Sequence, residues 1–512
     1  MTSVANVLNV QPTVQLTDKQ RRGVITGIFL GLFLGALDQT IVATAGPAIQ
    51  RDLSIPPSMY ALMTTVYIVA STVASPLYGK LFDRNGRKPV LLVGMLIFII
   101  GSALCGFSTN TQTLIIFRAI QGLGAAALFS GAFTVVADLF APQERARVGG
   151  FLSGIFGVAS VLGPLLGGII TDKLSWKWVF FLNIPIGILA IAFIGRQMPD
   201  VRPKHMQSRA PLDLLGALLL ILTMSPLLAA LTLGRSSVQP GGAGLLWSSP
   251  VIQGLLGLTA VGLVGFVLAE RKAKDPIVFF PIFTRRNSGV AMAAASVSSM
   301  CFLLTPVFLP LYMVHALKIS VADTGVTLIA LSIGIVVGSG LAGAMSVRVG
   351  RCRPALIAGL LVLLAAFGTI AFGISPHTTR GTLAGILFMI GLGVGPSLPL
   401  FTVVIQKSVE REHLGMATSA LGFSRSCGQI VGLAILSTIF NSSLVADLGA
   451  YGIASLSTVS PGTVSDPVVK EALTSALALL YKVALVIVSL GIGLTLCMPD
   501  VRLGKAAQTQ GG

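Results

Sequence analysis

The stretch GKLFDRNGRKP, residues 79–89, places one acid and four bases between two long apolar runs. Gly86 permits a tight backbone turn at its centre. Asp83 is able to pair with an arginine, or to sit at the N-terminus of a neighbouring helix, where the dipole favours negative charge. We therefore predict a loop that latches helices together in one conformation and releases them in another. A simple basic anchor beside a membrane is the alternative. The residues that carry this loop motif are Gly79, Asp83, Arg84, Gly86, Arg87 and Lys88.

The apolar runs belong to a chain of 512 residues, of which 54% are hydrophobic and only 10% charged. Soluble globular domains carry about 25% charged residues, so this composition indicates a membrane protein. Each run is long enough to cross a hydrocarbon core about 30 Å thick. We predict an all-α polytopic membrane protein with 14 transmembrane helices. The predicted spans are 23–48, 58–79, 89–108, 112–138, 147–171, 178–196, 211–233, 249–269, 288–313, 323–346, 354–374, 381–405, 414–440 and 476–498.

An even number of spans puts both termini on the same side of the membrane. Most of the 35 lysines and arginines fall on that side, which the positive-inside rule identifies as the cytoplasm. The basic residues form short clusters between apolar runs, so the net charge of +17 gives no reason to expect nucleic-acid binding. Two outer loops, 234–248 and 441–475, are longer than turns need. We predict a multi-pass protein of the cell (cytoplasmic) membrane with both termini cytoplasmic.

The loop pattern occurs twice in the chain. The stretch GAMSVRVGRCR, residues 343–353, repeats the glycine and arginine spacing of residues 79–89, although Val347 stands where Asp83 would recur. Two related halves are a recurring design of transporters. Spans seven and eight then form a hairpin inserted between two six-helix bundles. The predicted divisions are a cytoplasmic N-terminal tail 1–22, an N-terminal bundle 23–196, a linker with two additional spans 197–286, a C-terminal bundle 287–498 and a cytoplasmic C-terminal tail 499–512.

Asp38 is a carboxylate in the stretch FLGALDQTIVATAGPAI, residues 33–49, and lies inside the first predicted span, 23–48. A charge at the centre of a span costs about 2.5–3.5 kcal/mol on insertion scales, so intramembrane acids are functional candidates by default. Loss of water opposes ionisation of a carboxyl, and a nearby cation favours it. A carboxyl held between these effects is able to gain and lose a proton, as proton coupling requires. A structural acid that satisfies a polar contact is the alternative.

Arg118 is the predicted partner of Asp38. At the rise of an α-helix, Asp38 lies roughly 15 Å and Arg118 roughly 9 Å below the outer ends of their spans. The long arginine side chain bridges this difference, so we predict that Arg118 tunes Asp38 electrostatically. Gln121, one turn further along, extends the polar contact into the substrate pathway. A brace between helices is the alternative role for Arg118.

Arg425 lies near the middle of the thirteenth span, in GFSRSCGQ, without an acidic neighbour in sequence. A bare buried cation is costly, so we expect Arg425 to face the substrate pathway or to meet a partner on another helix. It would there bind an anionic group of the substrate or influence the coupled protons.

Other chemistries lack their residue patterns. No P-loop, HExxH or Ser/His/Asp arrangement occurs, and the five cysteines and four histidines show no metal-ligand spacing. We therefore expect no enzyme activity, no metal and no cofactor. The expected partners are a small-molecule substrate, protons and the lipid bilayer, without nucleic acid, and we expect a monomer.

Five stretches together resemble the motifs of one family of membrane transporters. Residues 79–89 resemble the cytoplasmic-loop signature of the major facilitator superfamily, and RAIQGLGAA, 118–126, resembles its fourth-helix signature. GPLLGG, 163–168, resembles the fifth-helix signature of the antiporter branches. LDQTIVATAGP, 37–47, and SWKWVFFLNIPIG, 175–187, resemble motifs of the fourteen-helix drug:proton antiporter family. The resemblance covers the whole chain and implies the major facilitator fold.

The antiporter motif consists of Gly163, Pro164, Gly167 and Gly168. Its three glycines form a small face that lets a neighbouring helix approach closely. Proline removes a backbone donor and crowds the preceding turn, so Pro164 is expected to bend the fifth span. The resemblance implies that this tight seam prevents leak between conformations.

The resemblance also implies a function. It predicts proton-coupled secondary active efflux of small amphipathic molecules, such as drugs, dyes and antiseptics, by alternating access. A dedicated exporter of one endogenous metabolite or lipid-like anion stays open. Intramembrane acids are few, and two deep arginines are present, which favours this alternative.

Overall fold

Helices account for nearly all of the described chain. The computed structural model describes residues 17–55, 57–140, 142–199, 213–235, 245–273, 281–284, 286–319, 321–376, 378–410, 413–449 and 466–498. The predicted C-terminal tail and all but residues 17–22 of the predicted N-terminal tail lie outside these ranges, as do the middle parts of both long outer loops.

In chain order, the helices are grouped below into an N-terminal half, the packed pair α8 and α9, which is called the hairpin, and a C-terminal half. The N-terminal half contains α1 Asp18–Asp52, α2 Pro57–Asn85, α3 Arg87–Gly106, α4 Thr111–Leu139, α5 Pro142–Lys173, α6 Lys177–Phe181 and α7 Asn183–Gln197. The hairpin contains α8 Leu214–Leu233, the short parallel strands β1 Gly234–Arg235 and β2 Leu245–Leu246, and α9 Pro250–Lys272. The C-terminal half contains α10 Pro281–Thr284, α11 Arg286–Met300, α12 Leu304–His315, α13 Val321–Val349, α14 Arg353–Gly373, α15 Arg380–Val394, α16 Ser397–Lys407, α17 Leu414–Gly449 and α18 Asp466–Cys497.

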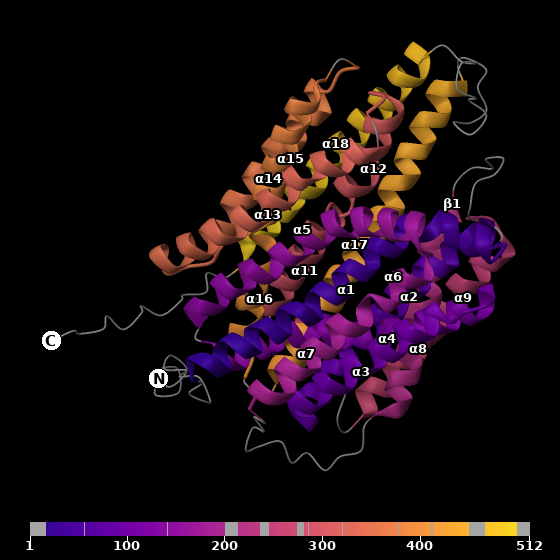
Figure 1. The fold of residues 1–512 in the computed structure, drawn as a ribbon. Helices are drawn as coiled ribbons and strands as arrows, with labels where there is room; N and C mark the ends of the chain where they lie inside the picture. Colours follow the sequence, from indigo (N-terminus) through magenta and orange to yellow (C-terminus); the bar gives the residue numbers. More distant parts are fainter. Residues whose placement is uncertain are drawn as a thin grey trace.

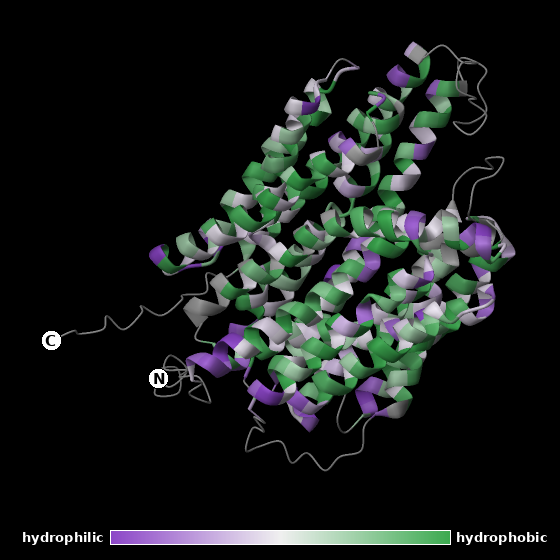
Figure 2. Cartoon of the chain, viewed as in Figure 1, coloured by the Kyte–Doolittle hydropathy of each residue, from purple (hydrophilic) through white to green (hydrophobic). Residues whose placement is uncertain are grey.

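Every predicted span coincides with a helix or a pair of helices. Eleven helical segments of the described residues are long and apolar enough to cross a membrane, and Leu215–Leu231 is a shorter apolar helix. The prediction for loop 441–475 was wrong at both ends, because α17 continues to Gly449 and α18 already begins at Asp466. The added turns are more polar than the spans, so hydropathy does not report them. Figure 2 shows polar residues gathered toward the helix ends.

Prolines divide three of the predicted spans into two helices each. Pro185 and Pro306 lie in the first turns of α7 and α12, and Pro396 directly precedes α16. Each proline lacks the N–H that would bond the carbonyl four residues earlier, which favours a break nearby. The missing N–H does not force a break, since α2, α8 and α12 continue through Pro76, Pro226 and Pro310. The breaks leave mean hydropathy unchanged, so the hydropathy pattern predicts continuous helices at these places.

Each half has its own hydrophobic core. One cluster of buried side chains runs from Val24 to Met198, and another from Cys301 to Val488. Between the halves, α2 packs against α17, and α5 packs against α13 and α16. We call the end of the molecule with residues 79–89 and 343–353 the basic end. Figure 1 shows the two halves close together toward this end and diverging toward the opposite end.

The α8–α9 hairpin packs on one side of the contact between the halves. α8 contacts α9, α2 and α17. A small apolar cluster joins Leu228 of α8 to Val69 and Val73 of α2 and to Ile430 of α17. The hairpin therefore contacts both halves.

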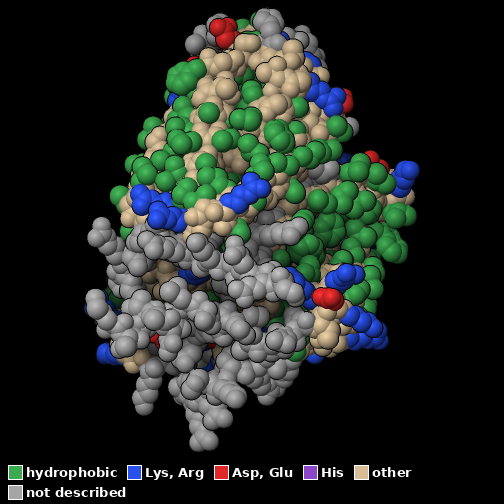
Figure 3. Space-filling view, turned by 90° about the vertical axis from the view of Figure 1, so that its left-hand side faces the viewer, with side chains coloured by type: hydrophobic (Ala, Val, Ile, Leu, Met, Phe, Trp, Pro, Cys, Tyr) green, Lys and Arg blue, Asp and Glu red, His purple; other side chains and the backbone are tan. Residues whose placement is uncertain are grey.

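The outer surface of the helices is largely apolar. Phe372 and Val261 are 76% and 73% exposed, and many other large apolar side chains are exposed as well. Figure 3 shows hydrophobic side chains over the flank of the molecule, with lysine and arginine gathered at its borders. A surface of this extent suits lipid contact better than water contact.

Candidate functional site

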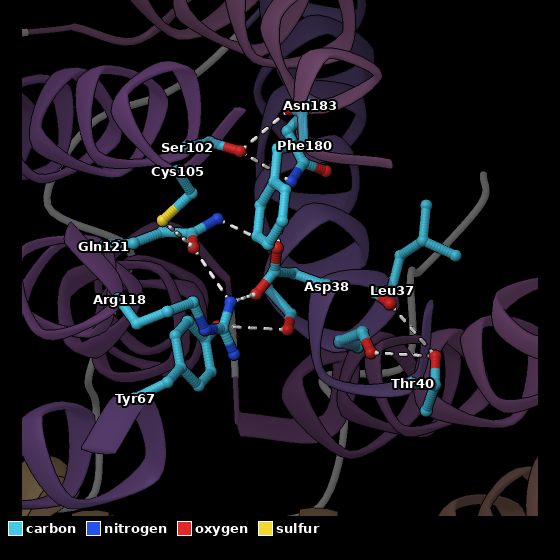
Figure 4. Close-up of polar contacts among 12 residues, drawn as sticks. Leu37, Asp38, Thr40, Tyr67, Ser102, Cys105, Arg118, Gln121, Phe180 and Asn183 are labelled. Carbon is cyan, nitrogen blue, oxygen red and sulfur yellow. Dashed lines mark hydrogen bonds and ion pairs between the residues drawn. The ribbon is translucent and has the colours of Figure 1, made fainter. Parts of the chain in front are cut away.

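Asp38 lies in the interior of the N-terminal half and is fully buried. Its carboxylate accepts three side-chain hydrogen bonds from two different helices. Arg118 Nη1 of α4 lies 2.5 Å from Oδ2, and Gln121 Nε2 of the same helix lies 2.8 Å from Oδ1. Asn183 Nδ2 of α7 lies 3.0 Å from Oδ1. Both carboxylate oxygens are therefore bonded, as a buried ionised carboxyl requires (Figure 4).

Arg118 is held between the carboxylate and aromatic rings. Its Nη1 also donates to Gln121 Oε1 at 2.8 Å, and its guanidinium carbon lies 4.2 Å from the centroid of the Tyr67 ring. The Phe180 ring lies 6.0 Å away. The Tyr67 hydroxyl donates to the Gly35 carbonyl of α1 at 3.2 Å. The described partners of the cation are thus one carboxylate, one amide oxygen and ring faces, while Arg118 Nε is buried without a hydrogen-bond partner among the described residues.

A further layer of polar groups connects Asp38 to α3 and α6. Asn183 Nδ2 also donates to Ser102 Oγ at 2.9 Å, and Ser102 Oγ donates to the Phe180 carbonyl at 2.8 Å. Cys105 Sγ lies 3.7 Å from Gln121 Oε1. The group Asp38, Arg118, Gln121, Asn183, Ser102, Phe180 and Cys105 is called the Asp38 network below.

The antiporter motif packs against α1, one turn beyond Asp38. A Cβ on Gly163 would lie 2.6 Å from Thr40 Cβ, and one on Gly167 would lie 2.9 Å from the Ile41 carbonyl oxygen. The Thr40 hydroxyl donates to the Ala159 carbonyl at 2.9 Å. Gly168 does not belong to this face, because a Cβ there would meet no atom within 4 Å. The predicted face of three glycines is therefore a face of two.

Pro164 lies within α5, which is assigned as one helix from Pro142 to Lys173. The proline therefore does not divide this helix, and the predicted bend stays a prediction. The side chain of Pro164 lies outside the described part of the structure.

Gly163→Val is expected to lower the free energy of unfolding by about 1–3 kcal/mol, because the added methyl groups force α1 and α5 apart. Thermal unfolding in detergent measures the loss. Gly168→Val is the matched control on the same helix, and its effect should stay within about 0.5 kcal/mol. Equal losses in the two variants would contradict close packing at Gly163.

At the basic end, Asp83 joins the two halves. Its carboxylate accepts from the backbone N–H groups of Gly415 at 2.9 Å and Met416 at 2.7 Å, in the first turn of α17. Arg87 Nη1 donates to the same carboxylate at 2.6 Å, and Arg87 Nε donates to Asp138 at 2.5 Å. Burial raises the pKa of the Asp83 carboxyl, and Arg87 and the two N–H donors act against this rise.

The other residues of the loop motif have different environments. A Cβ on Gly79 would lie 2.7 Å from Ser419 Cβ, so α2 and α17 touch here. Gly86 has a positive φ of 91°, and the matching Gly350 in the second half has 71°, which supports the repeat. Arg84 Nη1 is buried without a hydrogen-bond partner among the described residues. No described hydrogen bond or ion pair involves Lys88, so the motif residues do not form one cluster.

A second polar contact closes the basic end between other helices. Gln406 Nε2 of α16 donates to the Phe133 carbonyl of α4 at 3.2 Å and to Thr418 Oγ1 at 3.3 Å.

In the second loop, Val347 occupies the position that matches Asp83 and is 42% exposed. The acid that links the halves therefore has no counterpart in the repeat.

Asp83→Asn is expected to loosen the basic end, because the variant loses the negative charge at the N-terminus of α17. A cysteine placed at buried Ser419, with the native cysteines replaced, should react with a maleimide about 10-fold faster in the variant. Lys88→Gln, in the same loop, is the control and should leave the rate unchanged. An unchanged rate in Asp83→Asn would count against the latch.

Arg425 lies in the C-terminal half and does not contact the Asp38 network. Its side chain is 8% exposed. Nη2 donates to the carbonyls of Ser397 and Leu398 at 2.9 Å each, and Nη1 donates to Thr402 Oγ1 at 3.2 Å. These acceptors lie on α16, directly after the helix break. No ion pair with a described residue is seen, so neutral acceptors hold this cation.

A family model described as Major Facilitator Superfamily matches residues 28–432. The chain belongs to the major facilitator superfamily.

Relatives within this superfamily carry transporter names. The chain is 35% identical over 425 residues to the multidrug transporter protein MdtP of Bacillus subtilis (strain 168), covering 83% of this chain and 76% of that protein. It is 36% identical over 416 residues to multidrug resistance protein 3 of the same organism, covering 81% and 79%. The efflux pump FUS6 of Gibberella moniliformis is 27% identical over 517 residues, with coverage of 96% and 89%.

A solved structure has the same fold. The human organic anion transporter MFSD10 (TETRAN) matches with a TM-score of 0.57 at 16% identity, covering 92% of this chain and 100% of that chain. At this identity the match speaks for the fold alone. Together with the apolar helices, the family match and the named relatives show a multi-pass membrane transporter of the superfamily.

In this superfamily member, sequence reasoning found only part of the Asp38 network. Asp38, Arg118 and Gln121 were predicted and lie in contact. The other members, Asn183, Ser102, Phe180 and Cys105, were not predicted as site residues, and neither was Tyr67, whose ring packs on Arg118. Asn183 did carry a signal, since it is an amide in the apolar run FFLNIPIG, just before the proline that breaks the helix.

Proposed function

We propose that the protein exports small amphipathic molecules in exchange for protons, by alternating access, as a member of the fourteen-helix drug:proton antiporter family. The observation that carries the proposal is the buried carboxylate of Asp38, held by Arg118, Gln121 and Asn183 inside one half of a transporter. Buried ionisable groups in membrane proteins are functional by default. The names of the bacterial relatives support the substrate class.

The network gives Asp38 two defined states. When ionised, the carboxylate neutralises Arg118 and accepts three hydrogen bonds. When protonated, it no longer balances the guanidinium, so the packing of α1 against α4 and α7 changes with its charge. In this conformation Asp38 is fully buried. Proton exchange therefore requires a conformation in which this packing opens to water.

Alternating access supplies that opening. Here the halves are joined at the basic end through Asp83 and Gln406. Opening this end breaks those contacts and exposes the region between the halves to the cytoplasm. The proton gradient drives the cycle, since moving one charge through about 100 mV releases about 2.3 kcal/mol.

The membrane arrangement forms part of the proposal. We propose 14 membrane crossings, with α8 and α9 as the two additional ones, both termini in the cytoplasm and the basic end facing it. The distribution of lysine and arginine supports this orientation. We further propose that the transporter works as a monomer, because each half has its own core and both halves lie in one chain.

A dedicated exporter of an endogenous metabolite or lipid-like anion is the second candidate function. It is favoured by Arg425, a buried guanidinium whose described partners are all neutral. No described acid pairs with this guanidinium, so an anionic group of a substrate would supply the missing counter-charge.

Purified protein in lipid vesicles with an imposed pH gradient tests both functions. Cationic, neutral and anionic amphipathic compounds are offered in turn, and proton flux is recorded with a pH-sensitive dye. Compound-triggered proton flux is expected. Competition between cationic and anionic compounds then separates the two candidates, and transport that ignores the pH gradient would overturn both.

A further inference from the structure

Asn183 bonds to two parts of the Asp38 network at once. Its Nδ2 donates both to Asp38 Oδ1 and to Ser102 Oγ, while its Oδ1 is buried and has no hydrogen-bond partner in the described structure. Both Asn183 and Ser102 are fully buried. The nitrogen of the amide therefore donates two hydrogen bonds, while its oxygen accepts none among the described residues.

The ionisation state of Asp38 determines whether Nδ2 or Oδ1 of the Asn183 amide can form a hydrogen bond with its carboxyl group. An ionised carboxylate only accepts hydrogen bonds, so the amide must present Nδ2 to it. A protonated carboxyl carries one O–H donor that needs an acceptor. Arg118 offers only donors, and Gln121 Oε1 already accepts from Arg118. Of the described side-chain oxygens of the network, Asn183 Oδ1 alone accepts no hydrogen bond.

The position of Asn183 connects the orientation of its amide to the backbone at the α6–α7 junction. Asn183 begins α7, directly after the break that follows α6. Ser102, its second partner, donates to the carbonyl of Phe180 on the other side of that break. A chain of hydrogen bonds thus runs from Asp38 through Asn183 and Ser102 to the α6–α7 junction.

We propose that the Asn183 amide turns over when Asp38 gains a proton, and that Ser102 transmits this change to the α6–α7 break. The proton from water binds Asp38 Oδ1, and the new O–H donates to Asn183 Oδ1. The turned amide no longer donates to Ser102, whose hydroxyl then donates to Asn183 Oδ1. The Phe180 carbonyl loses its side-chain bond, and the junction loosens. Asn183 is thus a positioning residue, and this role rests on the proposed proton coupling.

Other ionisable groups surround Asp38. Arg118 on α4, Tyr67 on α2 and Cys105 on α3 are the described groups that interact with it electrostatically. Arg118 bonds Asp38 directly, Tyr67 packs against the Arg118 guanidinium, and Cys105 lies 3.7 Å from Gln121 Oε1. None of the three has a described side-chain hydrogen bond to α6 or α7. The hydrogen-bond chain to the junction therefore passes through Asn183.

Amide hydrogen exchange of the full-length protein in lipid nanodiscs tests the proposal. Exchange in residues 177–190, corrected for the intrinsic effect of pH, is followed by mass spectrometry while pH is lowered. The wild-type segment should exchange about five-fold faster once Asp38 is protonated, the change expected from losing one net hydrogen bond. Infrared absorption of the protonated carboxyl, assigned by its loss in Asp38→Asn, gives the pH at which Asp38 titrates.

Two variants test whether the Asn183 amide and Ser102 carry the pH response of this segment. In Asn183→Leu, exchange in the segment should no longer follow the titration of Asp38. In Ser102→Ala, which leaves the carboxylate contacts intact, exchange should be fast at every pH. A pH response that persists unchanged in either variant overturns the proposal, and Ser102→Ala keeps the test valid if Asn183→Leu does not fold.

Failure of the amide proposal is distinguishable from failure of the proposed function. Proton-driven transport that needs Asp38, without any pH response of residues 177–190, would overturn only the role of Asn183. A pH response in a protein that moves no substrate against a proton gradient would overturn only the function.

Discussion

Asp38→Asn is expected to lose all proton-driven accumulation of substrate. A membrane potential of about 100 mV supplies about 2.3 kcal/mol per proton charge, which equals a substrate gradient of about 50-fold. Asparagine is nearly isosteric with aspartate but cannot bind and release a proton. The variant should therefore still exchange substrate between compartments at equal concentrations, while the 50-fold gradient is abolished. Radiolabelled substrate uptake into inside-out vesicles measures both quantities.

The control for this prediction is Asp52→Asn. Asp52 lies on the same helix, is exposed, and accepts from Trp176 Nε1 at 2.7 Å, outside the Asp38 network. It should accumulate substrate like the wild type. Accumulation by Asp38→Asn at the wild-type level would show that the coupled proton binds elsewhere.

Arg118→Leu is expected to have the largest effect on stability. Removing the guanidinium leaves Asp38 as an unbalanced buried charge, and breaking a buried ion pair from one side costs about 3–5 kcal/mol. The double variant Arg118→Leu with Asp38→Asn removes both charges and should regain most of this loss. Chemical unfolding in mixed micelles measures the free energies of unfolding. Neither variant should accumulate substrate. The double variant should therefore regain stability against unfolding without regaining proton-driven transport.

The comparison between single and double variants decides this prediction. If Arg118→Leu were as stable as the double variant, the ion pair would not carry the stability of the network. Arg380→Leu is a suitable reference, because Arg380 pairs with Asp323 at 2.7 Å at a site where both side chains are about half exposed. That change should cost less than about 1 kcal/mol.

The arrangement of helices was largely predictable from the sequence. Hydropathy locates helices because the thickness of the bilayer imposes a length, and the repeated loops 79–89 and 343–353 predict two related halves. The same reasoning missed the extensions of α17 to Gly449 and of α18 from Asp466. Those turns lie outside the hydrophobic part of the pattern, where helix length is no longer tied to apolar content.

The charged residues of the candidate site could be predicted from the sequence. Asp38 and Arg118 were expected at depths of roughly 15 Å and roughly 9 Å, a difference that a long arginine side chain spans. Two opposite buried charges need each other, so their contact could be predicted. Asn183 could not be placed this way, because a neutral amide carries no such requirement. Its position depends on the break before Pro185, which hydropathy does not register.

The partners of Arg425 illustrate another limit. Ser397 and Leu398 accept through backbone carbonyls, which every residue possesses, so no side-chain pattern announces them. The one sequence signal was the proline at 396, which breaks the helix near these carbonyls.

The position of α8 makes the two flanks of the transporter unequal. Leu228 covers the line along which α2 and α17 meet, whereas the described residues of α8 and α9 do not pack in the same way on α5 and α13. An apolar molecule in the bilayer would therefore meet α8 in front of the contact between the halves on one flank, and α5 and α13 themselves on the other. A separation of the halves would have to displace α8 from α2 or α17 on the first flank only.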